Sequence, residues 1–251
     1  MISLKYKEIK ARKRVCLALD VPTVKEGLDL ASKLVDLVGT FKIGKQLHTA
    51  SGNEGVNIIG EIDNLDGGVF LDLKYHDTPN TVYQASKESA VPGVYMFNIH
   101  IAGGEEMCKK AIEGAYEGAQ ARGIERPRVI GVTVLTSLDD QDLATQRLKI
   151  TYDDLVRRRT ELAREWRLDG IVGPANKAGD LEKEFGSDFL YVTPGIKWQG
   201  KSGTGQKQLY TPDRAVQDCS NSILVMGSAI TKAKDKRKTA YEILKAMAQH
   251  L

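Results

Sequence analysis

Eight short apolar runs, each followed by a longer stretch with helical periodicity, constrain the fold of this chain more than any other feature. The runs are rich in β-branched residues and continuously apolar rather than alternating, which is typical of strands buried on both faces. Eight strand–helix units in 251 residues predict an α/β fold of the (β/α)8 TIM-barrel type. The expected strands are Val15–Leu19, Thr40–Ile43, Val69–Leu73, Tyr95–Ile99, Val129–Val134, Gly170–Val172, Phe189–Val192 and Ile223–Met226.

The stretches between these runs carry helix signals. Apolar residues three or four positions apart in the stretch 23–38 lie on one face of a helix. The pairs Thr78-Pro79 and Thr211-Pro212 predict helix starts at which the threonine hydroxyl caps the first turn. Further helices are expected at 105–121, 153–166 and about 238–250.

A doubly wound open sheet is the rival architecture, and the first strand–helix turn argues against it. That turn reads LALDVPT and lacks the GxGxxG pattern of a dinucleotide-binding fold. A domain size of about 150 residues would allow two domains. No linker or shift in composition divides the chain, however, so we expect residues 1–251 to form a single barrel domain.

Composition excludes several classes of protein. Hydrophobic residues make up 41% and charged residues 27%, as in ordinary globular proteins. No apolar run approaches the roughly 20 residues of a membrane span, and no apolar segment follows the basic N-terminus as in a secretory signal. Three widely spaced cysteines favour a reducing, cytoplasmic compartment. The net charge of +3 is too small to indicate a nucleic-acid partner and permits a small anionic substrate.

Charged residues occur where strands end, and the carboxyl ends of barrel strands line one mouth. Asp72 and Lys74 are two residues apart on one strand, so both should point into that mouth. We expect an alternating network of Lys42, Asp72, Lys74 and Asp77, because a lone buried charge costs several kcal/mol. A buried ion-pair network that only sets strand register is the alternative. Other polar residues at strand ends are Asp20, Asn98, His100, Thr136 and Ser137.

A glycine-rich segment, VTPGIKWQGKSGTGQKQ, follows the seventh expected strand, and VMGSAI contains the eighth strand's exit. Loops at these two positions of a barrel often bind phosphate through backbone N–H groups. An ordinary flexible loop is the alternative. The four histidines show no ligand spacing, so no metal is expected.

The run FLDLKYHDTPNTV resembles the signature of the orotidine 5′-phosphate decarboxylase family. Supporting matches extend over almost the whole chain, in family order: LALD, FKIG, NIHIAGG, VTVLTS, VTPGI and MGSAI. The shorter pattern D-x-K-x-x-D is shared with related sugar-phosphate barrels such as 3-keto-L-gulonate 6-phosphate decarboxylase. The extension HDTPNTV favours the orotidine enzymes.

The resemblance implies decarboxylation of orotidine 5′-monophosphate to uridine 5′-monophosphate in de novo pyrimidine biosynthesis, without cofactor or metal. Lys74 would be the general acid that protonates C6 of the pyrimidine as carbon dioxide leaves. Asp72 would lie beside the substrate carboxylate and hold Lys74. Lys42 and Asp20 would bind the ribose hydroxyls and complete the charge network.

The resemblance also implies a homodimer, in which Asp77 and Thr78 reach into the partner's site. Further substrate-binding positions that it implies are Thr81 in the P-N-T motif, Thr136 and Ser137 at the pyrimidine, Pro194 and Gly195 in the loop over the phosphate, and either Gln199 or Gln206 between base and phosphate.

The chain departs from the family pattern at one position. The eighth strand of the family usually exits as Gly-Arg, and that arginine clamps the phosphate. This chain has Gly227-Ser228 there. Lys197 could compensate in part, with Lys201 and Lys232 as further candidates, so we expect a weaker grip than an arginine provides.

Two other functions stay open from the sequence. A related phosphosugar lyase would use Lys74 to form an imine. A catalytically silent nucleotide-binding barrel would account for the missing arginine, although it would have no use for a buried lysine between carboxylates.

Overall fold

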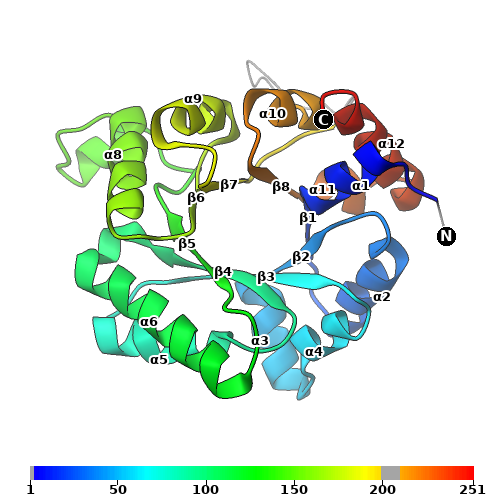
Figure 1. Cartoon of the computed structure of the whole chain (residues 1–251), viewed down its shortest axis with the longest axis horizontal. Coiled ribbons are helices and arrows are strands. Elements are labelled where there is room, and N and C mark those ends of the chain that lie inside the picture. Colours follow the sequence, from blue (N-terminus) through cyan, green and yellow to red (C-terminus); the bar gives the residue numbers. More distant parts are fainter. Residues whose placement is uncertain (1–2, 199–209) are drawn as a thin grey trace.

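The computed structural model describes residues 3–198 and 210–251. Within these ranges eight parallel strands pair in chain order and close into a barrel, which confirms the predicted fold class (Figure 1). Each expected apolar run forms a strand. The strands are β1 (Val15–Ala18), β2 (Thr40–Gly44), β3 (Gly68–Tyr75), β4 (Val94–His100), β5 (Arg128–Val132), β6 (Gly170–Val172), β7 (Leu190–Thr193) and β8 (Ser222–Met226).

Helices surround the barrel on its outside (Figure 1). The helix expected at 23–38 forms but ends at Leu34, and the last helix begins at Lys236. A short 3-10 helix, η1 (Ile101–Gly103), follows β4. The α-helices are α1 (Tyr6–Lys13), α2 (Val24–Leu34), α3 (Lys45–Glu54), α4 (Ile58–Asp63), α5 (Pro79–Ser89), α6 (Glu105–Arg122), α7 (Asp140–Thr145), α8 (Tyr152–Glu165), α9 (Ala175–Phe185), α10 (Pro212–Asp218), α11 (Ser228–Thr231) and α12 (Lys236–Ala248).

Strand alternation divides the core into two layers. Phe70, Met96 and Ile130 belong to an apolar cluster that fills the barrel interior. Their neighbours of opposite parity, such as Leu71 and Phe97, pack outward in a second cluster with the helices. Both faces of the strands are therefore buried, which explains why the strands read as continuous apolar runs.

Helix starts use side-chain caps at some positions and proline at others. The Thr23 and Asp235 side chains accept hydrogen bonds from first-turn N–H groups of α2 and α12. Thr78 and Thr211 precede α5 and α10 but make no such bond, so the prediction of hydroxyl caps there is wrong. The Thr78 hydroxyl instead pairs with the Thr81 hydroxyl at 2.9 Å. Proline at the first helical position supplies the helical φ at both sites without a cap.

The end of β3 departs from a regular strand. Its pairing with β4 runs through Leu71↔Phe97 and resumes at Tyr75↔Ile99, so β3 carries two extra residues there. Lys74 lies in this bulge with φ +52°, a left-handed conformation that costs an L-residue about 1–2 kcal/mol. Asp72 and Lys74 do meet as predicted. The reason differs from the predicted one, because the alternation of side chains between the two faces of the strand no longer applies at Lys74, inside the bulge.

Glycines allow α5 to pack closely on α6. A Cβ on Gly114 would lie 2.2 Å from the Tyr83 carbonyl oxygen, and one on Gly118 would lie 2.3 Å from that of Lys87. No side chain fits at such distances. This contact holds α5 in place, and with it Thr78 at the helix start.

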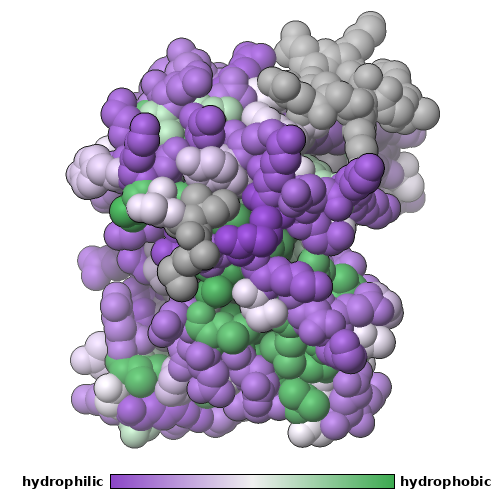
Figure 2. Space-filling model, turned by 90° about the vertical axis from the view of Figure 1, so that its right-hand side faces the viewer, coloured by the Kyte–Doolittle hydropathy of each residue, from purple (hydrophilic) through white to green (hydrophobic). Residues whose placement is uncertain are grey.

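The face that carries α1, α2 and α12 is hydrophilic over most of its area, with hydrophobic patches in its lower half (Figure 2). In the described ranges we find no helix that is long and apolar enough to cross a membrane. Cys16, Cys108 and Cys219 are buried free thiols, and Cys16 packs in the barrel interior.

Candidate active site

Four charged side chains gather at the carboxyl ends of the first three strands. Asp72 lies two residues beyond Phe70 of the barrel interior, so it projects inward above the apolar layer. Lys42 lies on β2, Lys74 near the end of β3, and Asp20 just after β1. We call Asp20, Lys42, Asp72 and Lys74 the charge network.

The charge network alternates in sign. Lys42 Nζ lies 2.8 Å from Asp20 Oδ1 and 3.5 Å from Asp72 Oδ2, and Lys74 Nζ lies 2.6 Å from Asp72 Oδ1. The structure thus confirms the predicted meeting of Lys42, Asp72 and Lys74. Within this chain the fourth member is Asp20, which the family resemblance implied, and not Asp77, which the charge pattern alone suggested.

Burial strengthens the interaction between the two central charges of the network, Lys42 and Asp72. The side chains of Lys42 and Asp72 are only 11% and 12% exposed. Burial acts to lower the pKa of Lys42, but Asp72 and Asp20 more than offset it, so the pKa is raised. Lys42 therefore stays charged at neutral pH. Charges held this far from water interact more strongly than they would on the surface.

Asn98, on the neighbouring strand β4, hydrogen-bonds two residues of the charge network. Its side chain is completely buried. The Oδ1 atom accepts a hydrogen bond from the Lys74 backbone N–H at 2.8 Å, and Nδ2 donates to Asp72 Oδ1 at 2.7 Å. The sequence identifies Asn98 only as a polar residue at a strand end. Its position two residues after the inward-facing Met96 is the signal that places it inside the barrel.

A small pocket of about 150 Å³ lies beside the charge network. Pro194 and Thr136, both expected at the substrate, line it together with Lys42, Asp72 and Lys74. Sequence reasoning did not identify its apolar walls. A typical ligand pocket exceeds roughly 300 Å³, so this one suits a single ring rather than a whole nucleotide. The apolar lining residues are Phe70, Val132, Val134, Leu135, Val172 and Val225.

Other expected site residues lie outside this pocket. Ser137 is exposed and does not line it. Asp77, Thr78 and Thr81 are exposed, and Asp77 Oδ1 accepts a hydrogen bond from the Thr78 N–H at 2.7 Å. Asp77 makes no ion pair with any residue that the structure describes. Its predicted place in a partner's site stays a prediction.

A second pocket, of about 520 Å³, lies at the exits of β7 and β8. Lys197, Ser228, Lys232 and Lys234 line it, and we call these four residues the lysine pocket. Trp198 also lines it, and Gly227 directly follows β8 and precedes Ser228. The three lysines match a binding site for an anion. Among the expected residues, Gln199 and Gln206 lie outside the described residues, as does Lys201.

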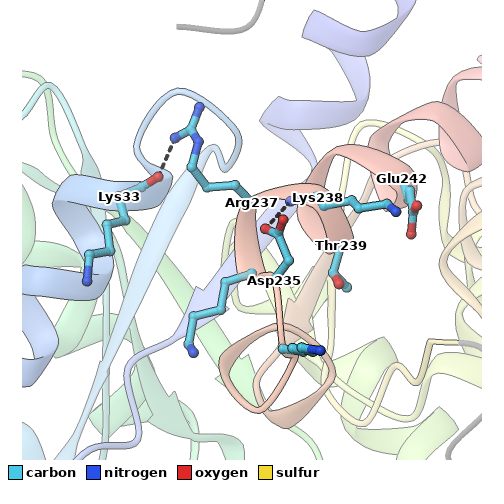
Figure 3. A pocket seen from close by; sticks show the side chains of 8 residues that line it. Lys33, Asp235, Arg237, Lys238, Thr239 and Glu242 are labelled. Carbon is cyan, nitrogen blue, oxygen red and sulfur yellow. Dashed lines mark hydrogen bonds between the residues drawn. The ribbon is translucent and has the colours of Figure 1, made fainter.

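A larger pocket of about 770 Å³ lies on the outer side of the barrel, at the start of α12 (Figure 3). It is basic, but several of its groups already have protein partners. Arg237 reaches toward α2, where it bonds the Lys33 carbonyl oxygen and forms two 2.7 Å bonds with Asp36. Asp235 accepts a hydrogen bond from the Lys238 N–H at 2.9 Å. This pocket shares no residue with the charge network.

Two histidines lie next to the charge network. The rings of His76 and His100 are 5.2 Å apart between centroids. Burial lowers the pKa of His100 to about 4, and the nearby His76 and Lys74 contribute further. His100 is therefore neutral at physiological pH and adds no cation beside Lys74.

Comparison with known proteins extends this geometry to a family. Residues 13–243 match the family described as orotidine 5′-phosphate decarboxylase / HUMPS. The chain belongs to this family. Its curated relatives include the orotidine 5′-phosphate decarboxylases of Geobacter metallireducens and Pelobacter propionicus. The first is 40% identical over 94% of this chain and 96% of its own length. The second is 41% identical over 90% of this chain and 91% of its own.

Solved structures of the family share the fold. The orotidine 5′-phosphate decarboxylase of Lactobacillus acidophilus is 31% identical and superposes with a TM-score of 0.80 over 93% of this chain and 98% of its own. The orotidine 5′-phosphate decarboxylase of Pyrococcus horikoshii is only 21% identical and still reaches a TM-score of 0.72, which concerns the barrel alone.

Proposed function

We propose that this protein is a carboxy-lyase that converts orotidine 5′-monophosphate to uridine 5′-monophosphate in pyrimidine biosynthesis. The single observation that carries the proposal is the Lys74 ammonium, 2.6 Å from Asp72 at the edge of a small, mostly apolar pocket. Membership of the decarboxylase family supports the choice of substrate.

The chemistry requires an acid at one carbon atom. The bond between C6 of the pyrimidine and the carboxylate breaks, carbon dioxide leaves, and the electron pair stays on C6. Lys74 Nζ stabilises this developing charge and then gives C6 its proton, so the reaction needs no cofactor in this proposal. Asp72 lies beside the departing carboxylate, and the repulsion between the two anions is relieved as carbon dioxide leaves.

The rest of the substrate supplies binding energy that acts at C6. In this proposal the pyrimidine occupies the 150 Å³ pocket, where Thr136 is a lining residue that can hydrogen-bond the ring. Lys42 and Asp20 hold the ribose hydroxyls, because they continue the charge network away from Lys74.

The phosphate occupies the lysine pocket in this proposal. Lys197, Lys232 and Lys234 provide the positive charge that Ser228 lacks. Pro194 lines the pyrimidine pocket and Ile196 lines the lysine pocket, so one short loop after β7 borders both ends of the nucleotide. A barrel mouth with a phosphate site after the last two strands is a recurring arrangement.

The test is an absorbance assay with orotidine 5′-monophosphate. We expect turnover by the wild type and a loss in kcat of about 100- to 10,000-fold in Lys74→Ala, the range for a general acid. Lys177→Ala is a matched control, because Lys177 pairs with Asp153 on the barrel exterior. An inactive wild type, or a Lys74→Ala variant with near-normal turnover, overturns the proposal. Borohydride trapping of Lys74 with substrate would instead indicate an imine-forming lyase.

The proposal includes a homodimer in which Asp77 and Thr78 complete the partner's site. Lys74→Ala and Asp77→Ala should each be inactive. A mixture of the two should recover up to about a quarter of wild-type activity, because half of the dimers are hybrids with one intact site. A mixture that stays inactive after confirmed subunit exchange rules out the shared site.

A further inference from the structure

Asn98 is a buried amide that joins the backbone of one candidate catalytic residue to the side chain of another. Its Oδ1 atom binds the Lys74 N–H at 2.8 Å, and its Nδ2 atom binds Asp72 Oδ1 at 2.7 Å. The side chain is fully excluded from solvent, so no water is available to replace either bond. The amide oxygen and the amide nitrogen therefore both bond residues of the same bulge.

The first bond replaces one that the bulge removes. Between Leu71↔Phe97 and Tyr75↔Ile99 the ladder from β3 to β4 is interrupted. The Lys74 N–H lies in this gap, and an unpaired buried N–H would be costly. The side-chain oxygen of Asn98, Oδ1, takes the place of the missing strand partner. It thereby supports the left-handed backbone, φ +52°, from which the Lys74 side chain starts.

The second bond orients the Asp72 carboxylate. Asp72 Oδ1 receives both Lys74 Nζ at 2.6 Å and Asn98 Nδ2 at 2.7 Å, while Oδ2 faces Lys42 at 3.5 Å. A carboxylate between two lysines could rotate to favour either one. The Nδ2 donor holds Oδ1 on the Lys74 side, and the other oxygen, Oδ2, faces Lys42 at the longer distance.

We propose that Asn98 is a positioning residue for the decarboxylation. It sets the angle and spacing of the Asp72–Lys74 pair through its two hydrogen bonds, without lining the pocket itself. The inference rests on the proposed function. Asn98 does not line the pocket, so it acts on the reacting atoms only through Asp72 and Lys74. A purely structural residue would instead stabilise the bulge without controlling the carboxylate.

Two substitutions separate these roles. Asn98→Ala removes both bonds. Asn98→Asp keeps the shape and the oxygen that accepts from the Lys74 N–H, but replaces the donor to Asp72 by a second oxygen. An ionised aspartate there repels Asp72, whereas a protonated one donates to it as the amide does. The Asn98→Asp variant therefore regains the wild-type bond only when it holds a proton.

The charged and titratable groups around this position come from several strands. Asp72 faces Lys42 on β2 and Lys74 on its own strand, with Asp20 beyond Lys42. Cys16 on β1 is buried nearby, and burial raises its pKa to about 12, so it does not titrate in the assay range. His100 on β4 is neutral there because of its lowered pKa. The pH dependence of Asn98→Asp is compared with that of the wild type, so their common titrations cancel.

We expect Asn98→Ala to lower kcat by about 100-fold, the cost of a misplacement near 1 Å, with KM changed little. The kcat of Asn98→Asp relative to wild type should fall as the pH rises from about 5 to 8. Thr160→Val is the control, because it removes a buried hydrogen bond to the Val156 carbonyl oxygen within α8, on the outside of the barrel. Circular dichroism checks that each variant folds, and Asn98→Asp carries the test where the alanine variant does not fold.

Three results overturn the inference: normal kcat in Asn98→Ala, normal kcat in Asn98→Asp at every pH, or a loss in Asn98→Asp that does not depend on pH. The second means that the backbone bond alone matters. Failure of the proposed function is a separate result, because the wild type would then show no turnover in the same assay.

Discussion

The two halves of the barrel mouth carry charge in different ways. The charge network lies on strands, its central members Lys42 and Asp72 are nearly buried, and its contacts are as short as 2.6 Å. The lysine pocket lies on loops and on α11, and Lys197, Ser228 and Lys232 are exposed. The first half holds charges in fixed positions, and the second offers charge on long side chains.

Under the proposed function, this difference matches the demands of the two ends of a nucleotide. A reacting carbon needs a cation in a fixed place before the reaction, because reorientation during the reaction adds to the barrier. A phosphate carries charge on several oxygens and tolerates donors that arrive from different directions. Under the proposed function, lysines serve where the family usually has an arginine, at the cost of ordering flexible side chains.

The largest effect is expected in the charge network. Asp72→Asn keeps the size of the side chain but removes the charge that holds Lys74 and Lys42 together. We expect kcat to fall about 100- to 1000-fold, as for loss of one preorganised electrostatic partner. Steady-state kinetics with orotidine 5′-monophosphate measures it. A loss below about 10-fold would show that the charge network is no more sensitive than the lysine pocket.

A smaller effect is expected in the lysine pocket. Ser228→Arg adds a charged donor beside Lys197 and Lys232, and a charged hydrogen bond contributes about 1.5–3 kcal/mol. We expect KM to fall about 10-fold or more while kcat stays nearly constant. Ser228→Gln is the control, because it adds length and a neutral donor without charge. Equal KM values for Ser228→Arg and the wild type would mean that the lysines already bind the phosphate so well that a further cation adds no affinity.

The smallest effect concerns stability next to the charge network. The unfolded chain protonates His100 near pH 6.5, whereas burial lowers its pKa to about 4 in the folded chain. Between these values the unfolded state binds more protons, so the free energy of unfolding decreases as the pH falls. Because His100 is only half-buried, we expect His100→Gln to reduce the decrease between pH 7 and pH 5 by about 1 kcal/mol.

Urea unfolding at the two pH values measures this difference. The control is His48→Gln, since His48 is exposed on α3. An unchanged pH dependence of the free energy of unfolding in His100→Gln would contradict the lowered pKa of His100 in the folded chain.

The barrel and much of the site could be predicted because their signals are local. Each strand reads as an apolar run, and the parity of Lys42 and Asp72 sends them inward. The helix caps were less predictable. Thr78 has a cap-forming side chain, yet its hydroxyl bonds Thr81 instead, because two hydroxyls three residues apart compete with the backbone.

The sequence by itself determined the order of strands and helices, the inward parity of the charged residues and the serine at the exit of β8, since each follows from neighbours along the chain. Only the tertiary structure decided how the charges combine. The bulge in β3, the left-handed Lys74 and the two bonds of Asn98 depend on the register between β3 and β4. Register is a property of two strands packed together, and no single segment specifies it.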